Sequence, residues 1–293
     1  MRSSPLAGRT VAVTGAARGL GAAMAREIAR HGARVALLGH EKAALDTVAA
    51  SLPGPALAIE VDVTDPAALA EAAAVRAGLG PPSAVVANAG IAEGGPFLAS
   101  DPAAWSRVID VNLTGSAHTA RAFLPDLLDT AGYFLQIASL ASLGAAPLMS
   151  AYCASKAGVE AFAHALRAEV AHRGVAVGIG YLNWTDTDMI RDADRYAVLR
   201  ELRTHMPPPA RRVHPVETVA ARLVTGLERR RTTVYAPAWL RLAQPVRAAL
   251  PPLVLRASRR ALPRLEAEEP VQYTGPLGAG GLADRAAHAP RKK

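Results

Sequence analysis

The chain has 293 residues, of which 51% are hydrophobic, and a formal net charge of +8. This length suits one large α/β domain with extensions, or two small domains, and allows a sizeable buried core. No apolar run approaches the roughly 20 residues of a bilayer-spanning helix, and the N-terminus lacks the apolar stretch of a signal peptide. Cys153 is the single cysteine, which excludes an internal disulfide and agrees with a reducing compartment. We therefore expect a cytoplasmic protein.

The positive charge is concentrated near the C-terminus. Nine arginines and no acidic residue lie between Arg229 and Leu265, one charge more than the whole net charge of +8. The rest of the chain is therefore close to neutral. A nucleic-acid site needs a basic patch supported by aromatic residues or a known motif. Neither is visible here, so we expect no nucleic-acid partner.

The first expected element is a buried strand over residues 10–14, and a helical pattern begins near Leu20. Between them, Gly15, Gly19 and Gly21 have the spacing G-x-x-x-G-x-G. Glycines at these positions allow a tight strand-to-helix turn and a close approach of the backbone to a pyrophosphate. The following helix N-terminus presents free N–H groups to the anion. The segment therefore predicts a dinucleotide-binding loop.

Strand-like and helix-like segments then alternate along the chain. The expected strands are 10–14, 34–38, 56–61, 83–87, 132–138, 175–181 and 232–236. The expected helices are 20–31, 41–51, 66–77, 103–130, 151–173 and 215–229. Near-continuous apolar strands alternating with helices predict an α/β fold, a Rossmann-like doubly wound parallel sheet of about seven strands with helices on both faces. Residues 186–214 break the alternation and predict a lid or binding loop.

The chain divides into three expected regions. Residues 1–236 form the dinucleotide-binding and catalytic domain, 237–265 a basic helical extension, and 266–293 a polar tail that we expect to be disordered. In the extension, Trp239, Leu242, Val246 and Leu250 fall on one helical face. Such a basic amphipathic pattern either lies in a membrane interface or packs on the enzyme or a sister subunit.

The run SAYCASKAGVEAF carries the candidate chemistry. Tyr152 and Lys156 are four residues apart, on the same face of a helix. A lysine ammonium beside a phenol favours the phenolate and lowers its pKa. A phenol with a lowered pKa can exchange a proton with an alcohol or carbonyl oxygen. Ser139 lies thirteen residues upstream of Tyr152. Cys153 is expected to be a packing thiol.

With these motifs in view, the chain from about Gly8 to Ala236 resembles the short-chain dehydrogenase/reductase family. TGAARGLG is similar to the family's cofactor loop, VDVTD to its adenine-contacting segment and ANAG to its structural NAG motif. VNLTG and IASLAS are similar to the segments that hold the catalytic asparagine and serine.

The resemblance implies a site built from four catalytic residues. Tyr152 is the expected general acid/base, and Lys156 lowers its pKa and holds the nicotinamide ribose. Ser139 is expected to stabilise the substrate oxygen, and Asn112 to hold a water that links Lys156 to solvent. Ser142 and Ser155 are expected at the surface. The implied cofactor contacts are Gly15, Arg18, Gly19, Leu20, Gly21, Gly39, His40, Asp62, Val63, Asn88, Ala89, Gly90, Tyr152, Lys156 and Thr187. No metal is expected.

One motif departs from the family pattern. Leu182 and Asn183 stand where the family has Pro-Gly, so Asn183 is expected to supply the positive φ of that glycine. Trp184 is expected either against substrate or cofactor, or in the core.

The residues after the second strand bear on the choice of dinucleotide. Gly39 occupies the position where an acidic residue would bond the ribose 2′-hydroxyl and repel a 2′-phosphate. Arg18 and His40 are possible phosphate donors. We therefore favour NADP over NAD. Glu41 favours NAD if the strand ends one residue later.

These features predict an NAD(P)-dependent oxidoreductase that interconverts a hydroxyl and a carbonyl group on a small lipophilic substrate. The alternative is a non-catalytic NADP-binding regulator or scaffold of the same fold. We expect a homodimer or homotetramer, with peripheral membrane contact through the extension if that segment binds lipid.

Overall fold

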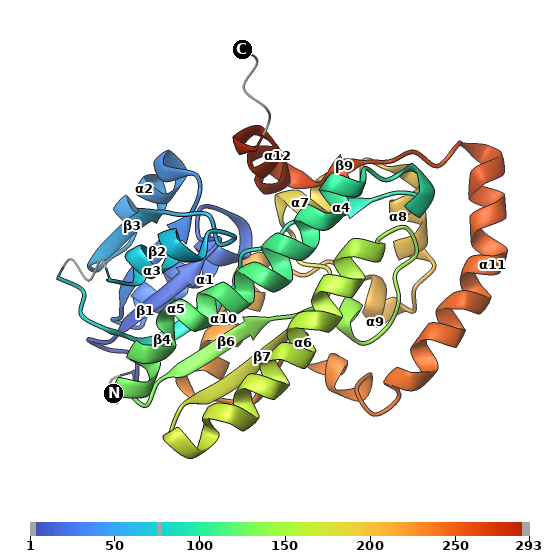
Figure 1. Ribbon diagram of the computed structural model, residues 1–293. Coiled ribbons are helices and arrows are strands. Elements are labelled where there is room, and N and C mark those ends of the chain that lie inside the picture. Colours follow the sequence, from blue (N-terminus) through green and yellow to red (C-terminus); the bar gives the residue numbers. More distant parts are fainter. Residues whose placement is uncertain (1–3, 75–77, 289–293) are drawn as a thin grey trace, which may run out of the picture.

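The computed structural model describes residues 4–74 and 78–288 (Figure 1). Its centre is a seven-stranded sheet in the order β3-β2-β1-β4-β6-β7-β8, with every neighbouring pair parallel. The strands are β1 Thr10–Thr14, β2 Arg34–Gly39, β3 Ala56–Glu60, β4 Pro82–Ala87, β6 Tyr133–Ile137, β7 Ala176–Leu182 and β8 Thr233–Ala236. The predicted doubly wound α/β fold is therefore confirmed.

Helices cover both faces of this sheet. The helices of the described residues are α1 Gly19–Arg30, α2 Lys42–Ala50, α3 Pro66–Ala74, α4 Pro102–Ile109, α5 Gly115–Asp129, α6 Ser150–Val170, α7 Asp188–Ala193, α8 Ala197–Thr204, α9 Pro208–Arg211, α10 Val216–Glu228, α11 Leu250–Glu268 and α12 Gly278–Ala287. Buried residues of α1, α2 and α10 pack on one face, and those of α3, α5 and α6 on the other. The segment 186–214, expected as a lid or loop, contains the three short helices α7, α8 and α9.

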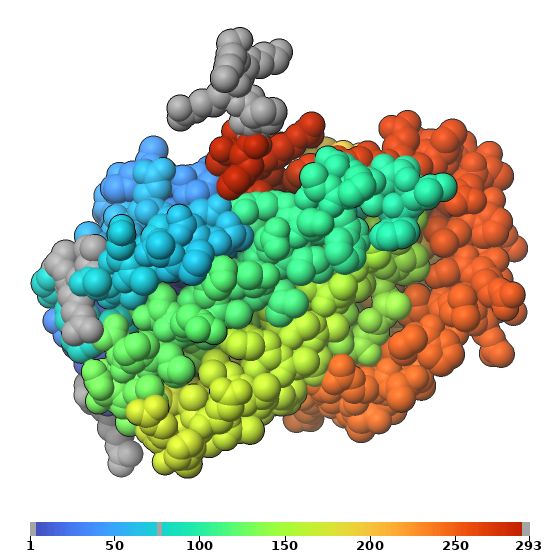
Figure 2. All heavy atoms as spheres, viewed as in Figure 1, coloured from blue at the N-terminus to red at the C-terminus, as the bar shows by residue number. Residues whose placement is uncertain are grey.

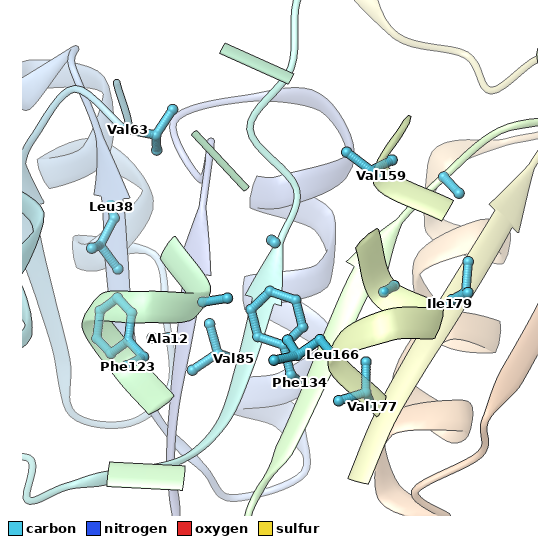
Figure 3. Packing of buried hydrophobic residues seen from close by; sticks show 14 of the residues in the cluster. Ala12, Leu38, Val63, Val85, Phe123, Phe134, Val159, Leu166, Val177 and Ile179 are labelled. Carbon is cyan, nitrogen blue, oxygen red and sulfur yellow. The ribbon is translucent and has the colours of Figure 1, made fainter. Parts of the chain in front are cut away.

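The core follows from the alternation of strand side chains. Ala12, Val85 and Phe134 point to one face, where they meet Phe123 of α5 and Leu166 of α6 (Figure 3). Their neighbours in the strands point to the opposite face, against α1 and α10. Because both faces are covered, the strands are apolar along their whole length, which is why the sequence predicts them well.

The sheet order places a ligand crevice at one defined edge. Strands β1 and β4 are neighbours, and the connections on either side of them run in opposite directions. In open α/β sheets, ligands bind beyond the carboxyl ends of strands at such a switch point. The glycine-rich loop follows β1 and the ANAG segment follows β4, so both reach this crevice.

The expected single helix over 103–130 is interrupted. A π-helical turn, Asp110–Thr114, joins α4 to α5. At this turn Asn112 points into the core and bonds the backbone of Ile91. Gly115 then packs on Val63, where an added Cβ would lie 2.6 Å from Val63 Cγ2. These tertiary contacts, which helical periodicity does not reveal, determine the interruption.

The predicted apolar stripe of the extension is wrong. Residues 237–249 form two short 3₁₀ segments, Ala238–Leu242 and Arg247–Ala249, and not a continuous helix. Trp239 and Leu250 pack against the core, whereas Leu242 and Val246 are exposed. Pro245 lies between the two segments, and proline disfavours a continuous helix there. The continuous helix of this region is α11, which runs along the right of Figure 1.

The expectation of disorder after residue 265 is wrong for most of that tail. Helix α11 continues to Glu268, strand β9 (Gly275–Pro276) pairs antiparallel with β5 (Glu93–Gly94), and α12 packs on α7. The glycine-rich composition of this segment suggests disorder, but in the structure its glycines allow close packing between helices. Gly278 has φ +73°, and an added Cβ would lie 2.6 Å from Met189 Cα. Residues 289–293 lie outside the described residues.

Candidate active site

A cavity opens at the carboxyl edge of β1, β4 and β6, with about 1360 Å³ of empty space including the part open to solvent. Its wall contains every site residue expected from the sequence except Asn112. These residues are Gly15, Arg18, Gly19, Leu20, Gly21, Gly39, His40, Asp62, Val63, Asn88, Ala89, Gly90, Ser139, Tyr152, Lys156 and Thr187. Gly15 and Thr187, which are 172 residues apart in the chain, thus line the same cavity.

The glycine loop is closely packed against the segment after β4. Asn88 Nδ2 donates to the carbonyl oxygens of Thr14 at 3.0 Å and of Gly15 at 3.3 Å. An added Cβ at Gly21 would lie 2.2 Å from the Gly15 oxygen. Gly15 itself has φ +63°, a conformation that favours glycine. The glycine loop therefore exposes its backbone to the cavity without intervening side chains, as a pyrophosphate site requires.

Tyr152, Ser139 and Lys156 form the polar end of the cavity. Tyr152 and Lys156 lie one turn apart on α6, with Lys156 Nζ 5.6 Å from the centroid of the tyrosine ring. Ser139 follows β6 and is hydrogen-bonded to the Tyr152 hydroxyl. Lys156 Nζ donates to the carbonyl oxygen of Ile137 at 3.2 Å. The three side chains thus come from two elements that pack directly on each other.

Burial dominates the titration of both groups. It raises the pKa of Tyr152 to about 12, although the hydrogen bond with Ser139 lowers it in part. Burial also lowers the pKa of Lys156 to about 8. The net lowering of the Tyr152 pKa that the sequence predicts is therefore not found, because burial dominates.

Asn112 lies behind this group and not in the cavity wall. It is 1% exposed. Its Nδ2 donates to the Ile91 oxygen at 3.0 Å and to Ser155 Oγ at 2.9 Å, and its Oδ1 accepts from the Ile91 N–H at 2.8 Å. The amide therefore links the segment after β4 to α6, and its side-chain donors are fully used by protein groups.

Ser142 and Ser155, expected at the surface, are buried, and that expectation is wrong. Ser155 Oγ donates to the carbonyl oxygen of Tyr152 at 2.8 Å. Ser142 Oγ donates to the carbonyl oxygen of Lys156 at 2.8 Å and accepts from the Ser139 N–H at 3.3 Å. Ser155 is three residues after Tyr152, on the same helix face. That spacing is the signal by which the sequence could have placed it inside.

The segment after β7 differs from expectation in one respect. Asn183 lines the cavity but does not adopt a positive φ, and its Nδ2 donates to the Ala210 oxygen at 2.9 Å. The backbone turn thus does not need a glycine here. Trp184 stacks under the guanidinium of Arg203, 5.8 Å from the ring centroid, and is not part of the cavity wall. Thr187 lines the cavity just before α7.

At the far end of the cavity, Gly39 is the last residue of β2, one position later than expected. Arg18 forms an ion pair with Glu41, with Arg18 Nε 3.1 Å from Glu41 Oε2. His40 lines the same region, and its Nε2 is buried without a hydrogen-bond partner among the described residues. This end therefore offers one paired guanidinium and one unused ring nitrogen.

Asp62 follows β3 and lines the cavity beside Val63. Burial alone would raise its pKa, but hydrogen bonds from the Thr64 N–H and the Arg107 guanidinium outweigh burial and hold the pKa at about 2. Arg107 on α4 and Asp284 on α12 complete this group. Neither residue was predicted from the sequence. Asp284 lies in the C-terminal segment, which the composition suggested was disordered, and Arg107 bonds it only when that segment folds against α4.

Cys153, next to Tyr152, contacts the backbone of Ala146 through its sulfur. Burial raises the pKa of this thiol. Both observations fit the expected packing role.

The comparisons with known proteins agree with this geometry. The family model described as "short chain dehydrogenase" matches residues 9–196. Galactitol 2-dehydrogenase (L-tagatose-forming) from Cereibacter sphaeroides is 36% identical over 74% of this chain and 87% of its own length. A short-chain dehydrogenase/reductase from Burkholderia phymatum in complex with NAD superposes with a TM-score of 0.71 at 25% identity, covering 83% of this chain and 93% of that one. A metagenomic short-chain oxidoreductase in complex with NADP superposes with a TM-score of 0.63 at 29% identity, covering 77% and 92%.

The family model covers more than half of the chain, and the match includes the glycine loop, the segment after β4 and the Tyr152–Lys156 pair. The chain therefore belongs to the short-chain dehydrogenase/reductase family of enzymes.

Proposed function

We propose that this enzyme interconverts a hydroxyl and a carbonyl group on a small lipophilic substrate, with NADP as the hydride carrier. One observation carries the proposal: Ser139, Tyr152 and Lys156 line the same continuous cavity as the glycine loop. A proton-transfer group and a dinucleotide loop facing one space are what a hydride-transfer enzyme requires.

Each polar side chain has a distinct role in this proposal. When bound, the nicotinamide supplies or accepts the hydride. In the reducing direction Tyr152 gives its hydroxyl proton to the carbonyl oxygen, and in the oxidising direction it removes the proton of the alcohol. Ser139, which already bonds Tyr152, donates to the same substrate oxygen and stabilises its developing charge. Lys156 holds a positive charge behind the tyrosine and favours the phenolate.

The surroundings of Tyr152 support a lipophilic substrate. The tyrosine packs in an apolar cluster of the lid segment and its neighbours. The cluster contains Ala92, Leu148, Met149, Met189, Ala193, Tyr196, Val198, Leu199 and Leu277. Besides Tyr152, Met189 and Leu277 of this cluster line the cavity. A polyol such as that of the galactitol relative would leave hydroxyl groups unpaired against these side chains, at a cost in binding. We therefore infer a substrate with a single polar reacting group and an apolar body.

The choice of NADP is supported by the residues after β2. No carboxylate occupies position 39, Arg18 and His40 both line the cavity, and the buried His40 Nε2 has no hydrogen-bond partner among the described residues. Two observations oppose this choice. Strand β2 ends at Gly39, one residue later than expected, which is the case in which Glu41 favours NAD, and Glu41 pairs with Arg18. Arginine carries five N–H donors, so a 2′-phosphate can still bond those that Glu41 leaves free.

A panel of hydrophobic ketones, aldehydes and secondary alcohols, each with NADPH and with NADH, tests the function. We expect dinucleotide oxidation at 340 nm with at least one apolar carbonyl and a preference for NADPH. A protein that binds NADPH and turns over no carbonyl or alcohol of the panel would instead be the non-catalytic regulator or scaffold. A protein that turns over polyols and rejects apolar substrates would overturn the substrate class.

We also propose that α11 attaches the enzyme to anionic membrane surfaces. None of its residues is buried, and Leu253 and Leu255 are 57% and 59% exposed. Its four arginines, Arg256, Arg259, Arg260 and Arg264, have no partner among the described residues. Exposed leucines beside unpaired cations suit an anionic lipid interface. None of the helices in the described residues is long and apolar enough to cross a bilayer.

Co-sedimentation with vesicles tests this attachment. Each basic residue near an anionic surface contributes roughly 1 kcal/mol, so the four arginines should suffice for pelleting that falls with added salt. The matched variant replaces the four arginines by glutamine in the full chain, because removing residues 237–249 would leave the buried Glu160 without Arg247. We expect anionic vesicles to pellet the parent and not the variant.

Equal pelleting of the parent and the variant, or pelleting of neither at low salt, would contradict the proposal. A change of oligomer size in the variant would show that α11 is a contact between copies of the expected homodimer or homotetramer.

A further inference from the structure

The C-terminal helix forms one wall of the cavity. Leu277, Gly278, Gly280, Gly281 and Asp284 all line it, together with the residues expected to contact the dinucleotide. Gly280 lies near Arg18, where an added Cβ would be 3.8 Å from Arg18 Cδ. The glycines of the first turn thus bring the backbone of α12 close to the cavity without side chains in between.

The start of α12 is fixed to the substrate side of the cavity. The Gly278 N–H donates to Asp192 Oδ2 at 2.9 Å, and Gly278 packs directly on the backbone of Met189 in α7. The preceding Leu277 N–H donates to the Ala92 oxygen at 2.8 Å. The Tyr273 hydroxyl donates to Glu93 Oε2 at 2.6 Å. These contacts join the C-terminal segment to the region after β4.

The end of α12 is fixed to the opposite side through Arg107. Its guanidinium donates to Asp284 Oδ1 at 2.7 Å and to Asp62 Oδ2 at 2.8 Å. Asp284 is 4% exposed, and His288 Nε2 lies 3.0 Å from Asp62 Oδ2. Asp62, Asp284 and His288 could surround a cation, but Arg107 already supplies positive charge to both carboxylates. The cluster is therefore explained by the guanidinium.

We propose that α12 is part of the dinucleotide site and that the Arg107–Asp284 pair holds it closed over the bound cofactor. This inference rests on the proposed function, since it requires a dinucleotide in the cavity. Helix α12 contacts α7 at its start and is linked to Asp62 through Arg107 near its end. It therefore extends from the substrate side of the cavity to the segment that resembles the family's adenine-contacting segment. A dinucleotide lying between the glycine loop and Asp62 has α12 across it. Release then requires α12 to move, and Arg107 and Asp284 act as positioning residues that slow release.

The test measures release directly. Protein loaded with NADPH is mixed in a stopped-flow instrument with excess NADP⁺, and the loss of bound-nicotinamide fluorescence is followed. Asp284→Ala removes a charge-assisted pair of hydrogen bonds and should raise the release rate about tenfold or more. Thermal unfolding of the unliganded variant, compared with the parent, checks folding separately, because a misfolded variant would fail to load NADPH at all and would not merely release it faster.

Two further variants make the result specific. Arg285→Ala changes an exposed arginine on the same helix that forms no ion pair with any described residue, and it should release NADPH at the parent rate. Asp284→Asn keeps the size of the side chain and should give an intermediate rate. Release from Asp284→Ala at the parent rate would overturn the role of α12 while leaving the proposed function intact. A parent protein that binds neither NADPH nor NADH would overturn the proposed function and this inference together.

Discussion

Tyr152→Phe should lower turnover by about a hundredfold or more, the usual scale for losing a general acid. The substitution removes one hydroxyl and keeps the ring that packs in the apolar cluster beside α7. Affinity for NADPH should persist, because the glycine loop and Asp62 region are untouched. The measurements are steady-state turnover on the best substrate of the panel and NADPH affinity by fluorescence titration.

A matched control separates chemistry from packing in this experiment. Tyr235→Phe removes a hydroxyl from β8, on the part of the sheet away from the cavity wall, and should keep near-parent turnover. If Tyr152→Phe retained near-parent turnover, Tyr152 would have no part in the proton transfer. If both variants lost activity equally, the effect would be structural.

Gly39→Asp should weaken NADPH binding by about a hundredfold and NADH binding far less, since unfavourable like-charge contacts cost several kcal/mol. The new carboxylate would stand at the end of β2, where it repels a 2′-phosphate and accepts a hydrogen bond from a ribose 2′-hydroxyl. The position can accept a side chain. An added Cβ would make only ordinary contact with Leu45, at 3.7 Å from Cδ2.

The control for this prediction is Gly39→Ala, which adds the Cβ without the charge and should leave both affinities within a few-fold of the parent. Parent protein that already binds NADH tenfold more tightly than NADPH would contradict the NADP proposal. In that case the Arg18–Glu41 pair is the physical reason, because Glu41 would neutralise the guanidinium and bond the ribose.

The sheet could be predicted from the sequence because its strands are buried on both sides. Val11, Val35 and Val86, for example, stand in continuous apolar runs that only a covered parallel sheet explains. The polar cavity residues could be located because they follow strand ends in a fixed order. Gly15 follows β1, Asn88 follows β4 and Ser139 follows β6, so the fold alone brings them to one edge.

The parts that could not be predicted depend on contacts between distant segments. Glu93 and Gly94 pair with Pro276 and Gly275, a separation that no local pattern reveals. The pairing of Arg107 with Asp284, 177 positions later in the chain, likewise has no local sequence signal. The Tyr152 pKa also follows from burial, which the sequence spacing of tyrosine and lysine does not report.

Helix α12, which lines one wall of the cavity, follows all seven strands of the sheet in the chain and is therefore synthesised after them. Domains fold as the ribosome releases them, N-terminal portions first. All seven strands of the sheet and the Ser139, Tyr152 and Lys156 side chains precede β9 and α12 in the chain. We therefore expect that the sheet can form, with its cavity uncovered, before Gly278–Ala287 emerges. Given the proposed role of α12, a dinucleotide present during synthesis would meet an open site at that stage, and α12 would then close over it.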